Sequence, residues 1–162
     1  IGWINRRVEI ELDLGLRQAI PSHYLARYTP FQARLALSQL DKIDSDSQKR
    51  IEKARLYCQG LSGIEGLVLP PEEKDALYIY PVFPIQCRSR QALLKWCLAR
   101  KRDMAAQHLK NCADLPAFSD FYQDCPVARK TANEVILLPT YTRYPNLEVQ
   151  KNIKVIRSYF KL

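Results

Sequence analysis

The chain has 162 residues, of which 47% are hydrophobic and 26% are charged, and its net charge at pH 7 is +8. This length suits one domain with a core of its own, which needs neither disulfides nor metal to fold. No segment approaches the roughly 18 consecutive apolar residues of a membrane-spanning helix, so that class is excluded.

The cysteines and histidines argue against a metal protein. No CxxC or CxxH pair occurs, and two histidines cannot build a His-rich cluster, so we expect no metal site. The cysteines are scattered and odd in total, and no secretory signal precedes them, which together indicate a cytoplasmic protein. The chain begins at Ile1 rather than methionine, so we expect a piece of a longer protein. The five cysteines are Cys58, Cys87, Cys97, Cys112 and Cys125.

The positive charge is concentrated in the second half of the chain. Residues 88–162 contain 14 basic and 6 acidic side chains, whereas residues 1–87 contain 11 of each. This imbalance favours an anionic partner, which could be a nucleic acid, a phosphorylated cofactor or a nucleotide-linked substrate.

In chain order, the first predicted element covers residues 1–21, where the Glu, Leu, Arg and Gln content favours a helix over a strand. Thr29, Pro30 and Gln32 then form a capping-box pattern with proline in the first turn. We predict a long helix from there to about residue 58, with a bend or break at residues 44–47. Its inward side chains are expected to be Phe31, Leu35, Leu37, Leu40, Ile43 and Ile51.

Glycines end this helix, and residues 69–73 read as a turn. A strand is predicted at about residues 76–86, and because Pro81 and Pro84 cannot donate to a ladder it should be an edge strand or an interrupted one. Ser89 is expected to cap a helix that reaches residue 102. The buried stripe of that helix should consist of Leu94, Cys97 and Leu98.

The last predicted elements follow an irregular stretch at residues 104–124. Pro126 should open a short helix to about residue 134, followed by a brief buried strand at residues 135–138 that Pro139 ends. Apolar residues at helical spacing predict a final helix over residues 146–160. Helices interspersed with a few short strands predict a small α/β or α+β domain.

Three stretches, in the same order, resemble the C-terminal region of the DegT/DnrJ/StrS group of sugar aminotransferases. CPVA (residues 125–128) with NEVILLPTY (133–141) is similar to the family's PVAE, short helix and V-L-S-L-P. RYTPFQARLALSQL (27–40) is similar to its R-M-S-x-I-Q-A-A-L-G-L-A-Q-L, and LPAF (115–118) to its Q-P-A-Y/F. The resemblance covers residues 27–160.

The resemblance implies the C-terminal small domain of a fold-type-I transferase, with a short, mainly antiparallel sheet flanked by helices. Residues 1–28 would be the connecting segment from a missing N-terminal large domain, and residues 29–162 the small domain. The parent would be a homodimer that uses pyridoxal phosphate (PLP) to aminate a keto-sugar, an anionic substrate linked to a nucleotide. No lysine here matches the family's cofactor lysine, so no catalytic residue is assigned, and the piece alone should be inactive and bind no PLP.

The resemblance also places a few residues of this chain near the substrate or cofactor. The family's V-H-Y-P segment near the substrate corresponds, after a one-residue gap, to the stretch around His108. The alternative for this stretch is a solvated polar loop. The residues expected beside the substrate or cofactor are Arg27, Tyr28, His108, Lys110 and Asn111.

Two further functions stay open. Leu25 stands where the family has an asparagine that reaches a cofactor phosphate across the dimer, and this favours a non-catalytic relative that serves as a binding or structural module. A basic nucleic-acid-binding domain would explain the charge, but no RNP-like, GxxG or helix-turn-helix pattern occurs, so this function is disfavoured. The basic residues at 88–102 also suit the C-terminal dipole of a solvated helix.

Overall fold

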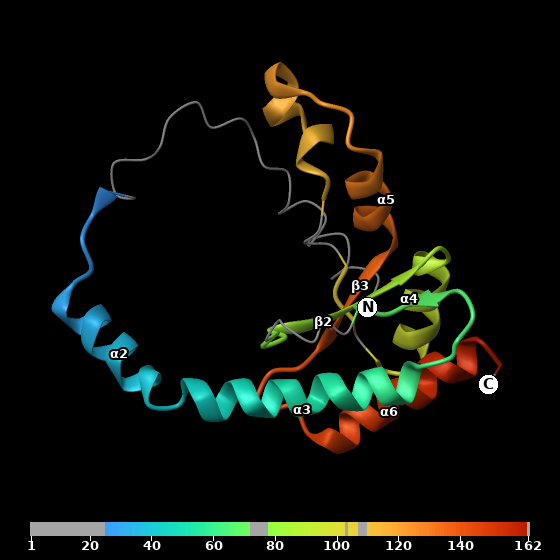
Figure 1. The fold of residues 1–162 in the computed structure, drawn as a ribbon, viewed down its shortest axis with the longest axis horizontal. Coiled ribbons are helices and arrows are strands. Elements are labelled where there is room, and N and C mark those ends of the chain that lie inside the picture. Colours follow the sequence, from blue (N-terminus) through green and yellow to red (C-terminus); the bar gives the residue numbers. More distant parts are fainter. Residues whose placement is uncertain (1–24, 72–77, 103, 107–109, 162) are drawn as a thin grey trace.

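The computed structural model describes residues 25–71, 78–102, 104–106 and 110–161 (Figure 1). The helix predicted at residues 1–21 lies outside these ranges. In chain order the described elements are helices α2 (Pro30–Leu40) and α3 (Ile43–Leu61), strands β1 (Leu67–Val68) and β2 (Val82–Cys87), helix α4 (Arg90–Ala99), 3-10 segments η2 (Cys112–Asp114) and η3 (Pro116–Phe121), helix α5 (Pro126–Glu134), strand β3 (Val135–Pro139) and helix α6 (Asn146–Tyr159).

The three strands form one antiparallel sheet in the order β1-β2-β3, which confirms the predicted mixed fold with a short antiparallel sheet. Val82 pairs with Pro139, and Gln86 pairs with Val135. Helix α3 packs along α6, and α4 packs on both α6 and β2. The largest fully buried apolar side chains are Tyr57, Phe83, Leu61, Ile85, Leu93, Ile136, Leu138, Ile156 and Val149. Within the described ranges, no helix is both long and apolar enough to cross a membrane.

Strand β2 is the middle strand of the sheet, so the first of the two predicted alternatives, an edge strand, is wrong. The reason for that prediction, a proline without an N–H to donate, still applies at Pro84. Strand β1 pairs only with Gln86 and Cys87, whereas β3 pairs with the whole of Val82 to Gln86. Pro84 therefore lies where β2 has a described partner on one side only, and its missing N–H removes no bond to β1.

The long helix is divided in two. The capping box at Thr29 is present, since the Gln32 amide N–H donates to the Thr29 hydroxyl and the Gln32 side chain accepts from the Thr29 N–H. The break falls at residues 41–42, before the predicted position, and α3 starts after Lys42 without a side-chain cap. Acidic residues in the first turn of α3 complement its dipole instead.

The predicted inward face of α2 was wrong. No residue of α2 is buried among the described residues, and Phe31 and Leu40 are 77% and 58% exposed. Leu35, Leu37 and Ile43 are exposed as well, and Ile51 is half-buried. Helix α2 extends away from the sheet beyond the start of α3 (Figure 1), so nothing in the described part of the chain covers it.

Helix α4 starts after Ser89 as predicted but ends at Ala99. The Ser89 hydroxyl does not cap the helix; it accepts from the Tyr159 hydroxyl at 2.9 Å and contacts the Cys87 sulfur at 3.2 Å. Cys97 is fully buried, and this burial raises the pKa of its thiol to about 11. The thiol is therefore protonated at neutral pH and fills space in the core.

The C-terminal third matches its prediction closely. Helix α5 covers Pro126–Glu134 and β3 covers Val135–Pro139, as the two prolines indicated. Helix α6 runs from Asn146 to Tyr159, with Val149 and Ile156 buried and Ile153 half-buried.

A buried polar network joins α3, β3 and α6. The Asn152 side-chain amide donates to the hydroxyls of Tyr57 at 3.0 Å and Tyr144 at 2.9 Å. The Tyr57 hydroxyl in turn donates to the Pro139 carbonyl oxygen at 3.3 Å. Burial raises the pKa of Tyr57 far above its ordinary value, so the hydroxyl remains a donor.

We predict that Asn152→Ala lowers the free energy of unfolding by about 2 kcal/mol, because it leaves buried hydroxyls without their partner and opens a small cavity. Urea denaturation followed by circular dichroism measures this. The matched control is Gln150→Ala on the exposed side of the same helix, which should change stability by less than about 0.5 kcal/mol. Equal effects of the two variants would contradict a stabilising role for the network.

Candidate functional site

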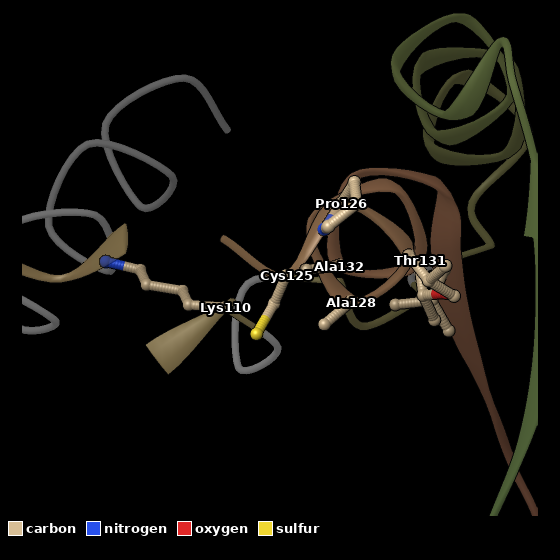
Figure 2. Close-up of a pocket in the computed structure, with 8 residues that line it drawn as sticks. Lys110, Cys125, Pro126, Ala128, Thr131 and Ala132 are labelled. Atoms are coloured by element: carbon tan, nitrogen blue, oxygen red, sulfur yellow. The ribbon is translucent and has the colours of Figure 1, made fainter. Parts of the chain in front are cut away.

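A hollow of about 640 Å³ lies along one side of α5 (Figure 2). Most of its lining is apolar or of small side chains, while Lys110, Cys125 and Thr131 contribute an ammonium group, a thiol and a hydroxyl. In Figure 2 the Lys110 side chain extends away from Cys125, so its ammonium group lies on the side far from α5. The lining consists of Lys110, Cys125, Pro126, Val127, Ala128, Thr131, Ala132 and Val135.

Local sequence explains where this hollow forms. Pro126 occupies the first position of α5, where its fixed backbone torsion suits a helix and its missing N–H costs nothing. The helix passes directly into β3, which is held in the sheet by β2. The wall formed by α5 is therefore positioned by the core.

Arg129 attaches the η2–η3 segment to α5. Its Nε and Nη2 donate to the two carboxylate oxygens of Asp114 at 2.8 and 2.7 Å. Its Nη1 lies 2.9 Å from an Asp124 oxygen, and Nη2 also donates to the Tyr122 hydroxyl at 3.4 Å. These bonds hold the pKa of Asp114 below its usual range, mainly through Arg129, so Asp114 is ionised throughout the neutral range.

This arrangement, here called the Arg129 clip, also positions the stretch that was expected to contact substrate. The Asp114 amide N–H donates to the Asn111 carbonyl oxygen at 3.1 Å. Asn111 is half-buried at the start of η2, and Lys110 before it is exposed on the lining of the hollow. The clip thus connects α5 to the segment that carries Lys110.

The structure brings only part of the predicted set together. Lys110 lines the hollow and Asn111 follows it, whereas Arg27 and Tyr28 are exposed just before α2, at the opposite side of the molecule (Figure 1). His108 lies outside the described residues. The roles of all five remain predictions.

Sequence reasoning missed other members of this region. Cys125 and its neighbours were noted as a family-like motif but not as the lining of a hollow. Arg129 was not singled out because its partners lie 15 and 5 residues before it, at spacings that no regular element brings together. Three aspartates, Asp114, Asp120 and Asp124, precede Arg129 in the sequence, but their spacing does not indicate which of them it binds.

We predict that Asp114→Asn loosens the η2–η3 segment, because the amide cannot accept two bonds from Arg129 as a carboxylate does. Chymotrypsin should then cut several-fold faster near Phe118 and Phe121, which are exposed. The cleavage sites are identified by mass spectrometry. Asp120→Asn, on the same segment but without a contact to Arg129, should leave the cleavage rate unchanged. Equal rates for both variants would contradict the clip.

Among the described residues, no group of three or more His, Cys, Asp and Glu side chains could hold a metal ion. PLP needs an amine for its imine, a carboxylate for its ring nitrogen and donors for its phosphate. The lining of the hollow includes the Lys110 amine but no carboxylate. This hollow therefore does not by itself fit PLP.

Comparisons with known proteins give one family. A family model described as the DegT/DnrJ/EryC1/StrS aminotransferase family matches residues 18–157. A comparison with curated protein sequences finds no match.

Several solved structures have a similar fold. S. venezuelae DesV in complex with a ketimine intermediate has a TM-score of 0.80 at 23% identity, over 84% of this chain and 38% of that one. A DegT DnrJ EryC1 StrS aminotransferase from Brucella abortus has a TM-score of 0.77 at 19% identity, over 84% and 37%. The sugar aminotransferase CalS13 from Micromonospora echinospora has a TM-score of 0.72 at 17% identity, over 98% and 45%. This chain spans less than half the length of each.

Proposed function

This chain belongs to the DegT/DnrJ/EryC1/StrS aminotransferase family, and we propose that it is the C-terminal small domain of a sugar aminotransferase whose cofactor lysine lies in another part of the parent protein. The family is PLP-dependent in general. The proposed reaction moves an amino group, usually from glutamate, to a nucleotide-linked keto-sugar. The proposed parent is a cytoplasmic homodimer with its active site between domains.

The exposed helix α2 carries this proposal. Its apolar side chains include Phe31, Leu35 and Leu40, all more than half exposed, and none of its residues is buried. An isolated helix of 11 residues is marginal in water, and an apolar helix is normally stabilised by packing against a second body. A large domain that covers α2 would provide this packing. This chain covers only 38% of DesV and 45% of CalS13, so the uncovered part of each relative is long enough to form such a domain.

In this proposal the chain forms part of the wall of the active site and does not supply the reacting lysine. When bound in the parent, PLP would supply the electron sink of the transfer. The hollow beside α5 would exclude water from one side of the substrate, because most of its lining is apolar. Lys110 would pair with an anionic group of the substrate as a flexible point charge.

The test compares the chain alone with its full-length parent. Both are incubated with PLP, glutamate and a nucleotide-linked keto-sugar, and the formation of 2-oxoglutarate is measured. We expect activity from the parent only. Activity of the isolated chain would contradict the assignment of the cofactor lysine to another part of the protein, and a parent that neither binds PLP nor reacts would favour the non-catalytic relative.

We predict that the isolated chain self-associates through α2 and that Phe31→Gln with Leu40→Gln reduces this association, because the double substitution removes exposed apolar surface. Sedimentation velocity over a range of concentrations measures it. The control is Val68→Gln with Leu147→Gln, which removes two apolar side chains of similar exposure, 57% and 60%, from other elements. An equal effect of the control would mean that α2 is not the associating surface.

Leu25 tests the second candidate, the non-catalytic relative. It is 78% exposed and, by the resemblance, replaces an asparagine that binds a cofactor phosphate. In the full-length parent, Leu25→Asn should tighten PLP binding about tenfold, because a hydrogen bond to a charged group is worth roughly 1.5 kcal/mol or more. Fluorescence titration with PLP measures this, with Ala26→Asn as the control. No change in affinity would count against a cofactor at this position.

A further inference from the structure

Helices α4 and α6 form one continuous surface because a tryptophan joins them. The Trp96 ring N–H donates to the Val155 carbonyl oxygen at 3.2 Å and to the Ser158 hydroxyl at 3.3 Å. Trp96 also packs edge-on against Tyr159, with ring centroids 5.9 Å apart. The outer sides of α4 and α6 are therefore held beside each other as one surface.

The outer side of α6 carries lysines at helical spacing. Lys151, Lys154 and Ser158 are all exposed and are separated by three and four residues, so they share one side of the helix. Lys151 bonds to Glu148 at 2.6 Å. The stretch from Lys151 to Ser158 covers roughly 10 Å of helix axis.

Helix α4 adds cations next to that row. The Arg100 guanidinium lies 3.3 Å above the ring of Trp96, and the same ring donates its N–H to Ser158 in α6. Lys101, directly after Arg100, is exposed just beyond the C-terminal end of α4. Two other basic residues have structural roles instead, since Arg90 donates to the Ala132 carbonyl oxygen and Arg102 pairs with Glu148. We call Arg100, Lys101, Lys151 and Lys154 the basic face, because the contacts of Trp96 with Ser158 and of Glu148 with both Arg102 and Lys151 hold the two helices together there.

The segments that form the basic face contain few acidic residues. Residues 88–102 contain no Asp or Glu, and residues 135–162 contain only Glu148. Glu148 is already paired with Arg102 and Lys151, which hold its pKa below the usual range. Helices α4 and α6 themselves therefore contribute little negative charge against the basic face, which favours an anionic partner.

We propose that the basic face binds the phosphate backbone of a nucleic acid, without sequence preference. Among the large apolar residues exposed in the described part of the chain, only Leu147 comes from α4 or α6. A protein partner would need an apolar centre, and a membrane would need side chains to insert, so this surface suits a highly charged, hydrated polymer best. This proposal is independent of the proposed role of the hollow beside α5.

The test uses the 162-residue chain and a fluorescein-labelled single-stranded oligonucleotide, with binding followed by fluorescence anisotropy over a range of salt concentrations. The face variant carries Arg100→Gln, Lys101→Gln, Lys151→Gln and Lys154→Gln. The control variant carries Arg34→Gln, Lys42→Gln, Arg55→Gln and Lys130→Gln, which are exposed residues elsewhere, so both variants lose four charges. Thermal melts followed by circular dichroism verify that both variants fold.

We expect the unmodified chain to bind more weakly as salt rises, because phosphate contacts release counterions. The face variant should bind at least about tenfold more weakly at low salt, with a slope of log affinity against log salt that is smaller by up to roughly three. The control should stay close to the unmodified chain. No binding at low salt, equal weakening of both variants, or binding only to vesicles of acidic lipid or to poly-glutamate would each overturn the proposal.

Discussion

The Asn152 amide bridges two tyrosine hydroxyls inside the core, and the packing of α3 against α6 depends on it. The helices lie close enough that a Cβ on Gly60 would stand 2.7 Å from Ile153 side-chain carbons, so only glycine fits there without a shift. One turn away, the Arg157 guanidinium donates to the Gly60 carbonyl oxygen at 3.0 Å. The close fit of Ile153 on Gly60 and the polar bonds of Asn152 and Arg157 thus fix the register of α3 against α6 together.

The same contact positions the candidate site. Tyr57 bonds to the end of β3 at Pro139, β3 pairs with β2, and β3 continues directly from α5. Arg129 of α5 then bonds to Asp114 and so holds the segment that follows Lys110 in the chain. The hollow is therefore supported from the core through one strand, one helix and one arginine, and its outer wall rests on charged bonds more exposed than those of the core.

The sequence predicted the elements whose signals are local. Thr29, Pro126 and Pro139 act within three or four residues, so the ends of α2, α5 and β3 could be inferred directly. Contacts between distant residues left no such signal. The Arg129 clip, and the lysines of α6 beside α4, appear only once the fold brings separate segments together.

Helix α2 shows that apolar periodicity predicts a face to be buried without identifying the surface that buries it. The apolar spacing predicted an inward face, and the apolar side chains are present, yet the described residues offer nothing for them to pack on. A pattern indicates that a face must be buried but does not say by which part of which chain. The mistaken core residues therefore support the proposed domain arrangement: side chains selected for burial, and left exposed in this piece, are expected where a second domain docks.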